Sequence, residues 1–244
     1  MNEHSLPPGT LYVIATPIGN LEDISARALR VLGEVDLIAA EDTRTTRKLL
    51  TRYGLRVPMV SLFDANVKRR IPQMLKELDE GKDIALVSEA GTPLISDPGA
   101  LLVKAAAEAG HTVTPIPGPT AIAALLSVAG LPADKFTFLG FLPRRAGQRR
   151  RMIEAISGQE WPTVLYESPH RIIATLEALR DVLGDREAII GREMTKLHEE
   201  IFRGTLSEAI DHFQKPRGEF SVVVAGATLR KAQGERGVGD TGLG

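Results

Sequence analysis

Residues 83–99, DIALVSEAGTPLISDPG, decide the fold of this chain. An apolar run breaks into Gly91-Thr92-Pro93, and an apolar helix pattern begins after the DPG triplet. This order predicts a buried strand followed by a short loop at the carboxyl edge of a sheet, which is where open α/β proteins bind ligands. Gly91 lets another molecule approach the backbone closely, and Pro93 restricts the loop before anything binds.

Two further segments have the same character. Residues 115–120, PIPGPT, also join a strand to a helix, and residues 15–20, ATPIGN, follow the first apolar run. An ordinary strand-to-helix turn explains any one of these loops. Three of them in one chain predict a shared binding cleft, because the carboxyl ends of parallel strands meet at one edge of the sheet.

The composition is ordinary for a globular protein. The 244 residues are 43% hydrophobic and 25% charged, with 30 basic and 31 acidic side chains. The near-zero net charge excludes a strong overall attraction to polyanions but leaves room for local basic patches. The chain has no cysteine, which excludes disulfides, thiolate nucleophiles and cysteine-bound metals. The five histidines lack metal-ligand spacing, so we predict no metal site.

No targeting or membrane segment is visible in the sequence. The amino terminus, MNEHSLPPG, has no signal-peptide pattern, and no apolar run approaches the roughly 20 residues that a membrane span needs. We therefore expect a soluble, cytoplasmic protein.

Strand-like and helix-like patterns alternate along the chain, which predicts an α/β fold. In the first half we expect strands at residues 11–15, 35–40, 84–88 and 112–116, and helices at 25–32, 43–53, 68–80, 98–109 and 120–129. In the second half we expect strands at 136–140, 163–166, 188–190 and 220–225, and helices at 149–156, 170–183 and 206–213. Gly54 is expected to end its helix in a left-handed conformation, and Thr205 and Glu208 fit a capping box.

The Pro-rich segment 116–120 is expected to separate two domains, because it would act as a stiff hinge. We predict an N-terminal α/β domain at residues 10–117 with a mostly parallel sheet, and a C-terminal α/β domain at 118–228 with a mixed sheet. Residues 229–244 are polar and Gly-rich, and we predict a disordered tail there.

Common nucleotide and nucleophile motifs are absent from the sequence: it contains no G-x-x-x-x-G-K-[ST], no G-x-G-x-x-G after the first strand and no G-x-S-x-G. Six other motifs occur in order, namely ATPIGNLEDIS, AAEDTR, SEAGTPLISDPG, PIPGPTAIAALLSVAGLP, YESPHR and REMTKLHEEIFRGTL. Together they resemble the tetrapyrrole-methylase-like methyltransferases and, within that superfamily, the branch of the ribosomal RNA small subunit methyltransferases I. The resemblance covers residues 10–227.

This resemblance implies an enzyme that uses S-adenosyl-L-methionine, held in a cleft between two α/β domains. It also implies a homodimer, and 2′-O-methylation of one cytidine ribose in the decoding region of the small subunit's 16S ribosomal RNA. Carried over by position, the cofactor-binding residues are Pro17, Ala90, Gly91, Thr92, Ile95, Thr120, Ala121, Glu167 and Gly204. Simpler explanations compete at three of them, since Ile95 and Ala121 also suit helix packing and Thr120 suits a helix cap.

A general base would help this reaction, because a ribose hydroxyl is a weak nucleophile near neutral pH; such a base contributes about 10²–10⁴-fold. The candidates near the predicted cleft are Glu41, Asp42, Glu89, Asp97, Glu167, His170 and Lys196. We favour Glu41 or Asp42 as the catalytic residue, because AAED ends a strand at the cleft edge. Asp97 is instead expected to cap the helix that follows it.

Local basic clusters are the expected RNA-binding surfaces, since arginine and lysine neutralise phosphates. The densest consists of Arg144, Arg145, Arg149, Arg150 and Arg151, and a second consists of Arg44, Arg47 and Lys48. A third, less distinctive group is residues 68–70. The alternative is that these clusters are charged surfaces that face solvent and bind no RNA. Aromatic residues make up only 5% of the chain, so we do not expect stacking on several bases.

Two positions depart from the pattern of this branch. Residues 61–66 read SLFDAN where a His-rich Y-H-x-H-N stretch is usual, and Glu89 stands where Asp is usual. Both changes bear on RNA contact or rate rather than on binding of the methyl donor. Two alternatives stay open. A tetrapyrrole C-methyltransferase would be expected to have G-P-G-D and G-G-D-P at its first and central loops, where this chain has TPIGN and AGTP. A non-catalytic RNA-binding or ribosome-assembly protein of the same fold would not bind the cofactor.

Overall fold

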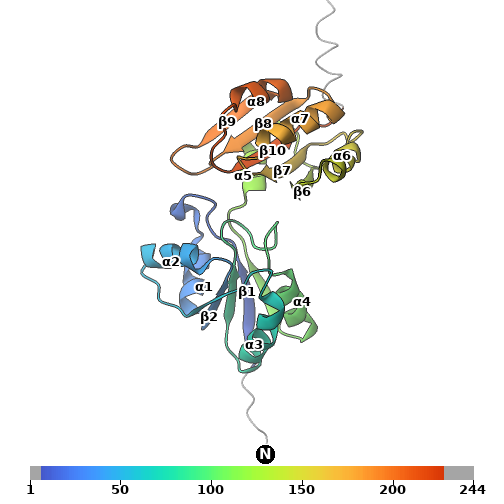
Figure 1. Cartoon of the computed structure of the whole chain (residues 1–244). Helices are drawn as coiled ribbons and strands as arrows, with labels where there is room; N and C mark the ends of the chain where they lie inside the picture. Colours follow the sequence, from blue (N-terminus) through green and yellow to red (C-terminus); the bar gives the residue numbers. More distant parts are fainter. Residues whose placement is uncertain (1–6, 228–244) are drawn as a thin grey trace, which may run out of the picture. The chain divides into compact units, whose positions relative to one another are not determined.

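The computed structural model describes residues 7–227, and the predicted tail at 229–244 lies outside them. The chain forms two compact units that divide between Thr120 and Ala121 (Figure 1). One contains a parallel sheet and the other a mixed sheet, both with helices, which confirms the predicted fold class. Of the helices within residues 7–227, none combines the length and apolar character that a membrane span requires.

The N-terminal unit alternates strands and helices. Its elements are β1 (Thr10–Ile14), the 3-10 helix η1 (Leu21–Asp23), α1 (Ala26–Glu34), β2 (Leu37–Ala40), α2 (Thr43–Arg52), β3 (Met59–Ser61), α3 (Val67–Asp79), β4 (Ile84–Val87), α4 (Ala100–Glu108) and β5 (Thr112–Ile116). The strands are parallel, in the order β3-β2-β4-β1-β5. The chain leaves β1 toward β2 on one side and leaves β4 toward β5 on the other. A topological switch point, where ligands bind in such sheets, therefore lies between β1 and β4.

Helices cover both faces of this sheet, which explains why its strands show no apolar–polar alternation. All four residues of β4 are buried. Ala85 and Val87 belong to a core shared with α1 and α2, whereas Ile84 and Leu86 belong to a second core shared with α3 and α4. Figure 1 shows the two helix pairs on opposite sides of the strands. Burial on both faces holds the carboxyl edge of the sheet, and the loops that leave it, in place.

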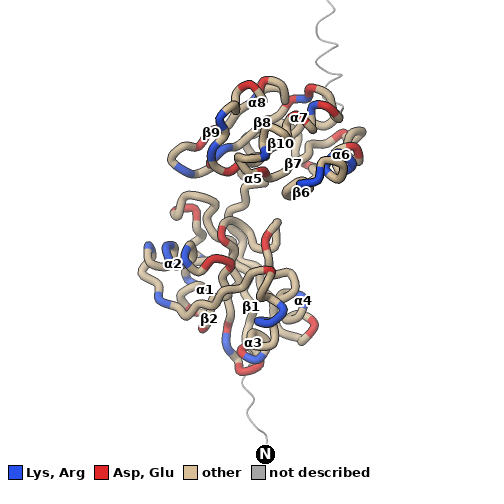
Figure 2. Tube along the Cα trace, in the orientation of Figure 1, with Lys and Arg blue, Asp and Glu red and all other residues tan. Residues whose placement is uncertain are grey.

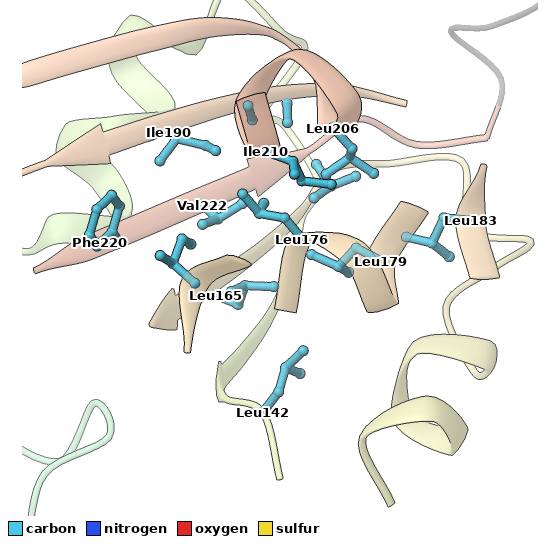
Figure 3. Close-up of a cluster of buried hydrophobic side chains, with 14 of the residues drawn as sticks. Leu142, Leu165, Leu176, Leu179, Leu183, Ile190, Leu206, Ile210, Phe220 and Val222 are labelled. Atoms are coloured by element: carbon cyan, nitrogen blue, oxygen red, sulfur yellow. The ribbon is translucent and has the colours of Figure 1, made fainter. Parts of the chain in front are cut away.

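The C-terminal unit contains α5 (Ala121–Ala129), β6 (Thr137–Phe141), α6 (Ala146–Glu154), β7 (Thr163–Glu167), α7 (Ile172–Leu183), β8 (Glu187–Arg192), β9 (Glu200–Thr205), α8 (Leu206–His212) and β10 (Phe220–Val224). The strand order is β6-β7-β10-β8-β9, in which β6 and β7 are parallel and the other neighbours are antiparallel. Its largest core lies between the sheet and helices α7 and α8. Leu176, Leu179 and Leu206 pack there near Leu165 and Val222 of the strands (Figure 3).

The predicted elements agree with the structure to within a few residues at most ends, and two local signals are confirmed. Gly54 has a φ of +69° after α2, and the capping box of Thr205 and Glu208 begins α8. Two strands were not predicted, β3 and β9. Both lie at the edge of a sheet, where half of the backbone is unpaired and little apolar surface is buried, so neither carries a strong apolar run. The predicted Asp97 cap is wrong, because Gly99 occupies the N-cap position of α4 and no side chain caps that helix.

Candidate functional site

Three loops meet at the carboxyl edge of the N-terminal sheet, at the switch point. The N–H of Thr16, after β1, donates to the carbonyl of Gly91 at 2.8 Å, and the N–H of Gly91 donates back to the Thr16 carbonyl at 3.0 Å. The hydroxyl of Thr92 donates to the carbonyl of Pro119 at 3.1 Å. These bonds join the loop after β4 to the loops after β1 and β5, so the three segments singled out in the sequence lie together.

The loop between β4 and α4 has an unusual backbone. Four of its residues have positive φ: Gly91 (82°), Leu94 (72°), Ser96 (68°) and Gly99 (121°). A residue other than glycine in this region costs about 1–3 kcal/mol, and such residues concentrate at binding and active sites. Leu94 and Ser96 therefore mark this loop as one whose shape is maintained for a function.

Gly91 keeps the meeting point of the loops open. A Cβ on this buried residue would lie 3.4 Å from Cγ2 of Ile18 and 3.7 Å from the carbonyl oxygen of Pro119, so any longer side chain would fill the space between them. Within residues 7–227, the backbone N–H groups of Ala90 and Thr92 donate no hydrogen bond. The loop thus has free donors beside an open space.

The other predicted cofactor residues of this unit lie on the same loops. Pro17 is buried directly after Thr16, and Thr120 is half-buried at the end of the loop after β5. Ile95 is 38% exposed and belongs to neither core of the unit. Its exposure leaves an apolar side chain available beside the polar backbone of the loop.

A carboxylate with altered acidity, that of Glu41, lies at this edge directly after β2. Its Oε2 accepts a hydrogen bond from the N–H of Glu89 at 3.1 Å. Burial raises the pKa of Glu41 despite that bond, and the negative charges of Glu89, Asp64 and Asp42 raise it further. A carboxyl group whose pKa is raised holds a proton more readily.

Asp97 shares this acidic environment. Burial raises the pKa of Asp97 to about 6, the negative charge of Glu41 adds to the increase, and a hydrogen bond from Ser88 opposes it. Since Asp97 does not cap α4, its partly buried carboxyl group has no helix-capping function to explain its position.

Asp42 has a different environment from its neighbour Glu41. Its carboxylate occupies the N-cap position of α2 and accepts a hydrogen bond from the N–H of Arg44 at 2.7 Å. The guanidinium of Arg44 lies 3.0 Å away, and its hydrogen bonds lower the pKa of Asp42. A lowered pKa makes a weaker proton acceptor, so the geometry favours Glu41 over Asp42 for that task.

A shallow groove of about 530 Å³ lies along α2, and two rows of side chains line it: Thr43, Arg47 and Thr51 in one, and Arg44, Lys48 and Arg52 in the other. Arg44 pairs with Asp42 and Arg52 lies 3.8 Å from Glu22. In the part of the chain that the structure describes, Arg47 and Lys48 have no ion-pair partner. The groove therefore has the charge that suits a phosphate.

In the C-terminal unit, Glu167 is buried at the end of β7 with its carboxylate fully engaged. It accepts hydrogen bonds from the Thr175 hydroxyl at 2.7 Å and the Ser168 N–H at 2.8 Å. Nη2 of Arg171 lies 3.5 Å from the same carboxylate. These contacts tie the end of β7 to the start of α7 and occupy both carboxylate oxygens of Glu167.

The two remaining cofactor predictions, Ala121 and Gly204, lie in different elements of this unit. Ala121 is the first residue of α5, and Gly204 lies in β9. A Cβ on Gly204 would lie 2.6 Å from Oε2 of Glu208 and 2.8 Å from the ring of Phe202. Neighbouring side chains of the same unit therefore explain why no side chain is present at this position.

The main arginine cluster lies before and along α6, where Figure 2 shows a run of basic residues. Arg144 and Arg145 precede the helix, and Arg145 is its N-cap residue without a capping side-chain bond. Arg150 pairs with Glu154 at 2.8 Å. Among the described residues, Arg144, Arg145 and Arg151 have no ion-pair partner. Most of the positive charge of this cluster is therefore available to a ligand.

Sequence reasoning missed two features of the N-terminal site. The left-handed residues Leu94 and Ser96 carry no signal, because neither is a residue type that favours positive φ. The position of Asp97 was misread because Asp before Pro-Gly is also a capping pattern. In segment 61–66, which lacks the expected histidines, Asn66 holds its own loop: its side chain accepts from the Phe63 N–H at 2.9 Å and donates to the Ser61 carbonyl at 3.1 Å.

Comparison with known proteins identifies relatives over most of the chain. Residues 10–210 match the family described as Tetrapyrrole (Corrin/Porphyrin) Methylases. A Thermotoga maritima protein named ribosomal RNA small subunit methyltransferase I is 50% identical over 89% of this chain and 99% of its own length. A protein of the same name from Synechocystis is 49% identical over 90% of this chain and 80% of its own.

A solved structure shows the same fold. The uroporphyrin-III C-methyl transferase from Thermus thermophilus, complexed with S-adenyl homocysteine, is similar to this chain with a TM-score of 0.63 at 18% identity. The match covers 91% of this chain and 100% of that structure.

Proposed function

This chain belongs to the tetrapyrrole methylase family and, within it, to the ribosomal RNA small subunit methyltransferases I, and on that premise we propose that it methylates small-subunit ribosomal RNA. The methyl donor in this proposal is S-adenosyl-L-methionine. The acceptor is the 2′-hydroxyl of a cytidine ribose in the decoding region of 16S RNA. The observation that carries the proposal is the 50% identity to a relative of that name over 89% of the chain.

The edge of the N-terminal sheet has the features that this donor needs. S-adenosyl-L-methionine supplies an electrophilic methyl group, so the protein has to bind and orient it. The open space at Gly91, the free N–H groups of Ala90 and Thr92, and the exposed side chain of Ile95 match a ligand with polar edges and an apolar part. We assign donor binding to Pro17, Ala90, Gly91, Thr92, Ile95 and Thr120 in this unit, and to Ala121, Glu167 and Gly204 in the other.

Glu41 accepts the proton of the ribose hydroxyl in this proposal. Its raised pKa makes it a stronger proton acceptor than an ordinary carboxylate, and among the described residues no cation pairs with it. Asp42, the other catalytic prediction, is assigned to the start of α2 because its carboxylate already binds Arg44. Alignment of the acceptor oxygen with the methyl group lowers the activation free energy further, on the order of 7–11 kcal/mol in well-oriented reactions.

Ionic contacts from two helices bind the RNA in this proposal. The first set is Arg144, Arg145, Arg149, Arg150 and Arg151 around α6, and the second is Arg44, Arg47 and Lys48 in the groove of α2. Each cation that neutralises a phosphate releases a counterion, so binding should weaken steeply with salt. A homodimer and a cytoplasmic site of action complete the proposal; both rest on the family resemblance, and sedimentation of the full chain tests the first.

The decisive experiment is transfer of a labelled methyl group from S-adenosyl-L-methionine to purified small ribosomal subunits that lack the modification, followed by nucleoside analysis. We expect labelled 2′-O-methylcytidine. Thr92→Arg should abolish the product by blocking the loop edge. Leu101→Arg is the matched control, because it places the same charge at an exposed position of α4.

Three outcomes would overturn parts of the proposal. A different labelled nucleoside would overturn the cytidine assignment. Donor binding without transfer to the subunit would point to another acceptor, with tetrapyrroles tested next. Failure to bind the donor would remove the enzymatic function and leave the RNA-binding alternative.

A further inference from the structure

We propose that Phe141, supported by Tyr166, is a stacking platform on which an unpaired base of the RNA lies while the arginines around α6 hold its phosphates. This inference rests on the proposed function, because it takes RNA as the ligand. It assigns base contact to a surface for which the sequence predicted only ionic contacts.

The aromatic pair lies at the ends of the two parallel strands of the C-terminal sheet. Phe141 is the last residue of β6 and is 53% exposed, although large apolar side chains are usually buried. Its ring centroid lies 5.8 Å from that of Tyr166, and Phe138 meets Tyr166 at 5.0 Å. Phe141 therefore has one side packed on an aromatic neighbour and another side in solvent.

The backbone around Phe141 is shaped to place the ring there. The pairing of β6 with β7 shifts register between Phe138 and Phe141, and Gly140 between them has a φ of +62°. Such irregularities redirect a side chain at the end of a strand. Immediately after it, Nη2 of Arg171 donates to the carbonyls of Leu142 at 2.6 Å and Pro143 at 3.4 Å. The segment that carries Phe141 is thus held by the side chain of Arg171, the N-cap residue of α7.

Arginines follow Phe141 closely in the sequence. Arg144 and Arg145 follow Phe141 by three and four residues, and both are exposed. In the described part of the chain neither has an ion-pair partner, and Arg151 on α6 is equally unpaired. Exposed aromatic rings beside unpaired arginines are the combination that binds single-stranded nucleic acids, since the ring stacks on a base and the cations meet the phosphates.

The chemistry favours RNA over a second protein surface. Arg144, Arg145 and Arg151 have no ion-pair partner among the described residues, so the surface suits a partner that carries several negative charges close together, as a phosphate backbone does. It also favours single-stranded over double-stranded RNA, because a base must be unstacked before it can lie on an aromatic ring.

The test is binding of the full chain to a 12-nucleotide single-stranded RNA that contains 2-aminopurine, measured by anisotropy and by quenching of the 2-aminopurine fluorescence. Phe141→Ala should weaken binding by about 5- to 150-fold and abolish the quenching, as expected for one stacked base. Phe141→Trp should preserve both signals, and it provides a second test of stacking if the alanine variant does not fold.

Two control variants separate stacking from other effects. Phe136→Ala removes a ring of similar exposure, 44%, just before β6, where no arginine cluster follows, and it should bind like the unmodified chain. Arg144→Gln combined with Arg145→Gln should reduce the slope of log affinity against log salt by about 1.4, whereas Phe141→Ala should leave that slope unchanged.

Several results would overturn the platform. Unchanged binding by Phe141→Ala, an equal loss with Phe136→Ala, or equal affinity for the same RNA as a duplex would each do so. A changed oligomeric state of Phe141→Ala with unchanged RNA affinity would show instead that the ring contacts a second copy of the chain. The RNA-binding assay requires no methyl donor. If the unmodified chain binds RNA through Phe141 but does not methylate small subunits, that result overturns only the proposed function.

Discussion

The N-terminal and C-terminal units use their strand ends differently. In the first, five parallel strands end at one edge, and hydrogen bonds from Thr16 and Thr92 join the loops that follow three of them. In the second, only β6 and β7 are parallel neighbours, and their ends carry Phe141 and Tyr166. Strand direction therefore decides how many side chains a sheet can gather at one edge: a parallel sheet assembles a site from several loops, and a mixed sheet gathers fewer.

The edge of the N-terminal sheet and the surface around α6 also differ in the sign of their charge. The edge of the N-terminal sheet holds the carboxyl groups of Glu41 and Asp97, whose pKa values are raised by burial. The C-terminal unit has a run of basic residues around α6 (Figure 2), of which Arg144, Arg145 and Arg151 have no ion-pair partner among the described residues. Proton transfer and donor binding suit the sheet edge of the first unit, whereas contact with phosphates suits the surface around α6 and the separate groove along α2.

The largest expected effect tests whether the open space at the N-terminal edge is essential. Gly91→Val should abolish donor binding and methyl transfer, because its side chain would fill the space next to Ile18 and Pro119. Gly54→Val is the matched control: Gly54 has a φ of +69°, similar to the +82° of Gly91, but nothing lies within 4 Å of its Cβ position. In both variants the new valine has to adopt a positive φ, so the conformational free-energy cost is similar in the two. Calorimetric titration with S-adenosyl-L-methionine should therefore separate them, and equal affinities would exclude this edge as the donor site.

The next effect distinguishes the two acidic residues after β2. Glu41→Gln keeps the shape of the side chain and should lower the methyl-transfer rate by about 10²–10⁴-fold with little change in donor affinity. Asp42→Asn should lower it far less, since asparagine is as good an N-cap as aspartate. Single-turnover methylation of small subunits measures both rates. A larger loss in Asp42→Asn would reverse the assignment.

A smaller effect tests the basic surface of the C-terminal unit. Replacing Arg144, Arg145 and Arg151 together by glutamine should reduce the slope of log affinity against log salt by about 2, since each phosphate contact with single-stranded RNA contributes roughly 0.7. Arg150→Gln should change the slope less, because Arg150 already pairs with Glu154. Titrations of RNA binding at several salt concentrations give the slopes. A slope that stays unchanged in the triple variant would mean that this cluster only faces solvent.

The smallest effect concerns stability and pH at the N-terminal edge. The pKa of Asp97 is about 6 in the folded protein, above its ordinary value of 3.8, so folding keeps a proton that the unfolded chain has released. Stability therefore falls as pH rises from about 4 to 6 and stays reduced above that range. Asp97→Asn should be more stable than the unmodified chain at pH 7.5, by at most about 2 kcal/mol, and the gain should disappear toward pH 4. Urea unfolding at both pH values checks this, and a variant that is less stable at pH 7.5 would contradict it.

Much of the fold could be predicted because it depends on residues close together in the chain. The alternation of strands and helices, the left-handed Gly54 and the capping box of Thr205 and Glu208 are all local patterns, and the structure contains each of them. The edge strands β3 and β9 escaped prediction, because a strand with one free edge and little buried surface needs no strong apolar run.

The sequence by itself determined the alternating α/β organisation, the position of the strand-to-loop segment around Gly91, and, through six ordered motifs, the family. Only the tertiary structure decided that Thr16 and Gly91 pair, that Glu41 and Asp97 share one acidic environment, and that Phe141 stays exposed. The physical reason is distance along the chain. Local propensities act over a few residues, whereas strand neighbours, burial and the fields that alter a pKa depend on segments that folding brings together.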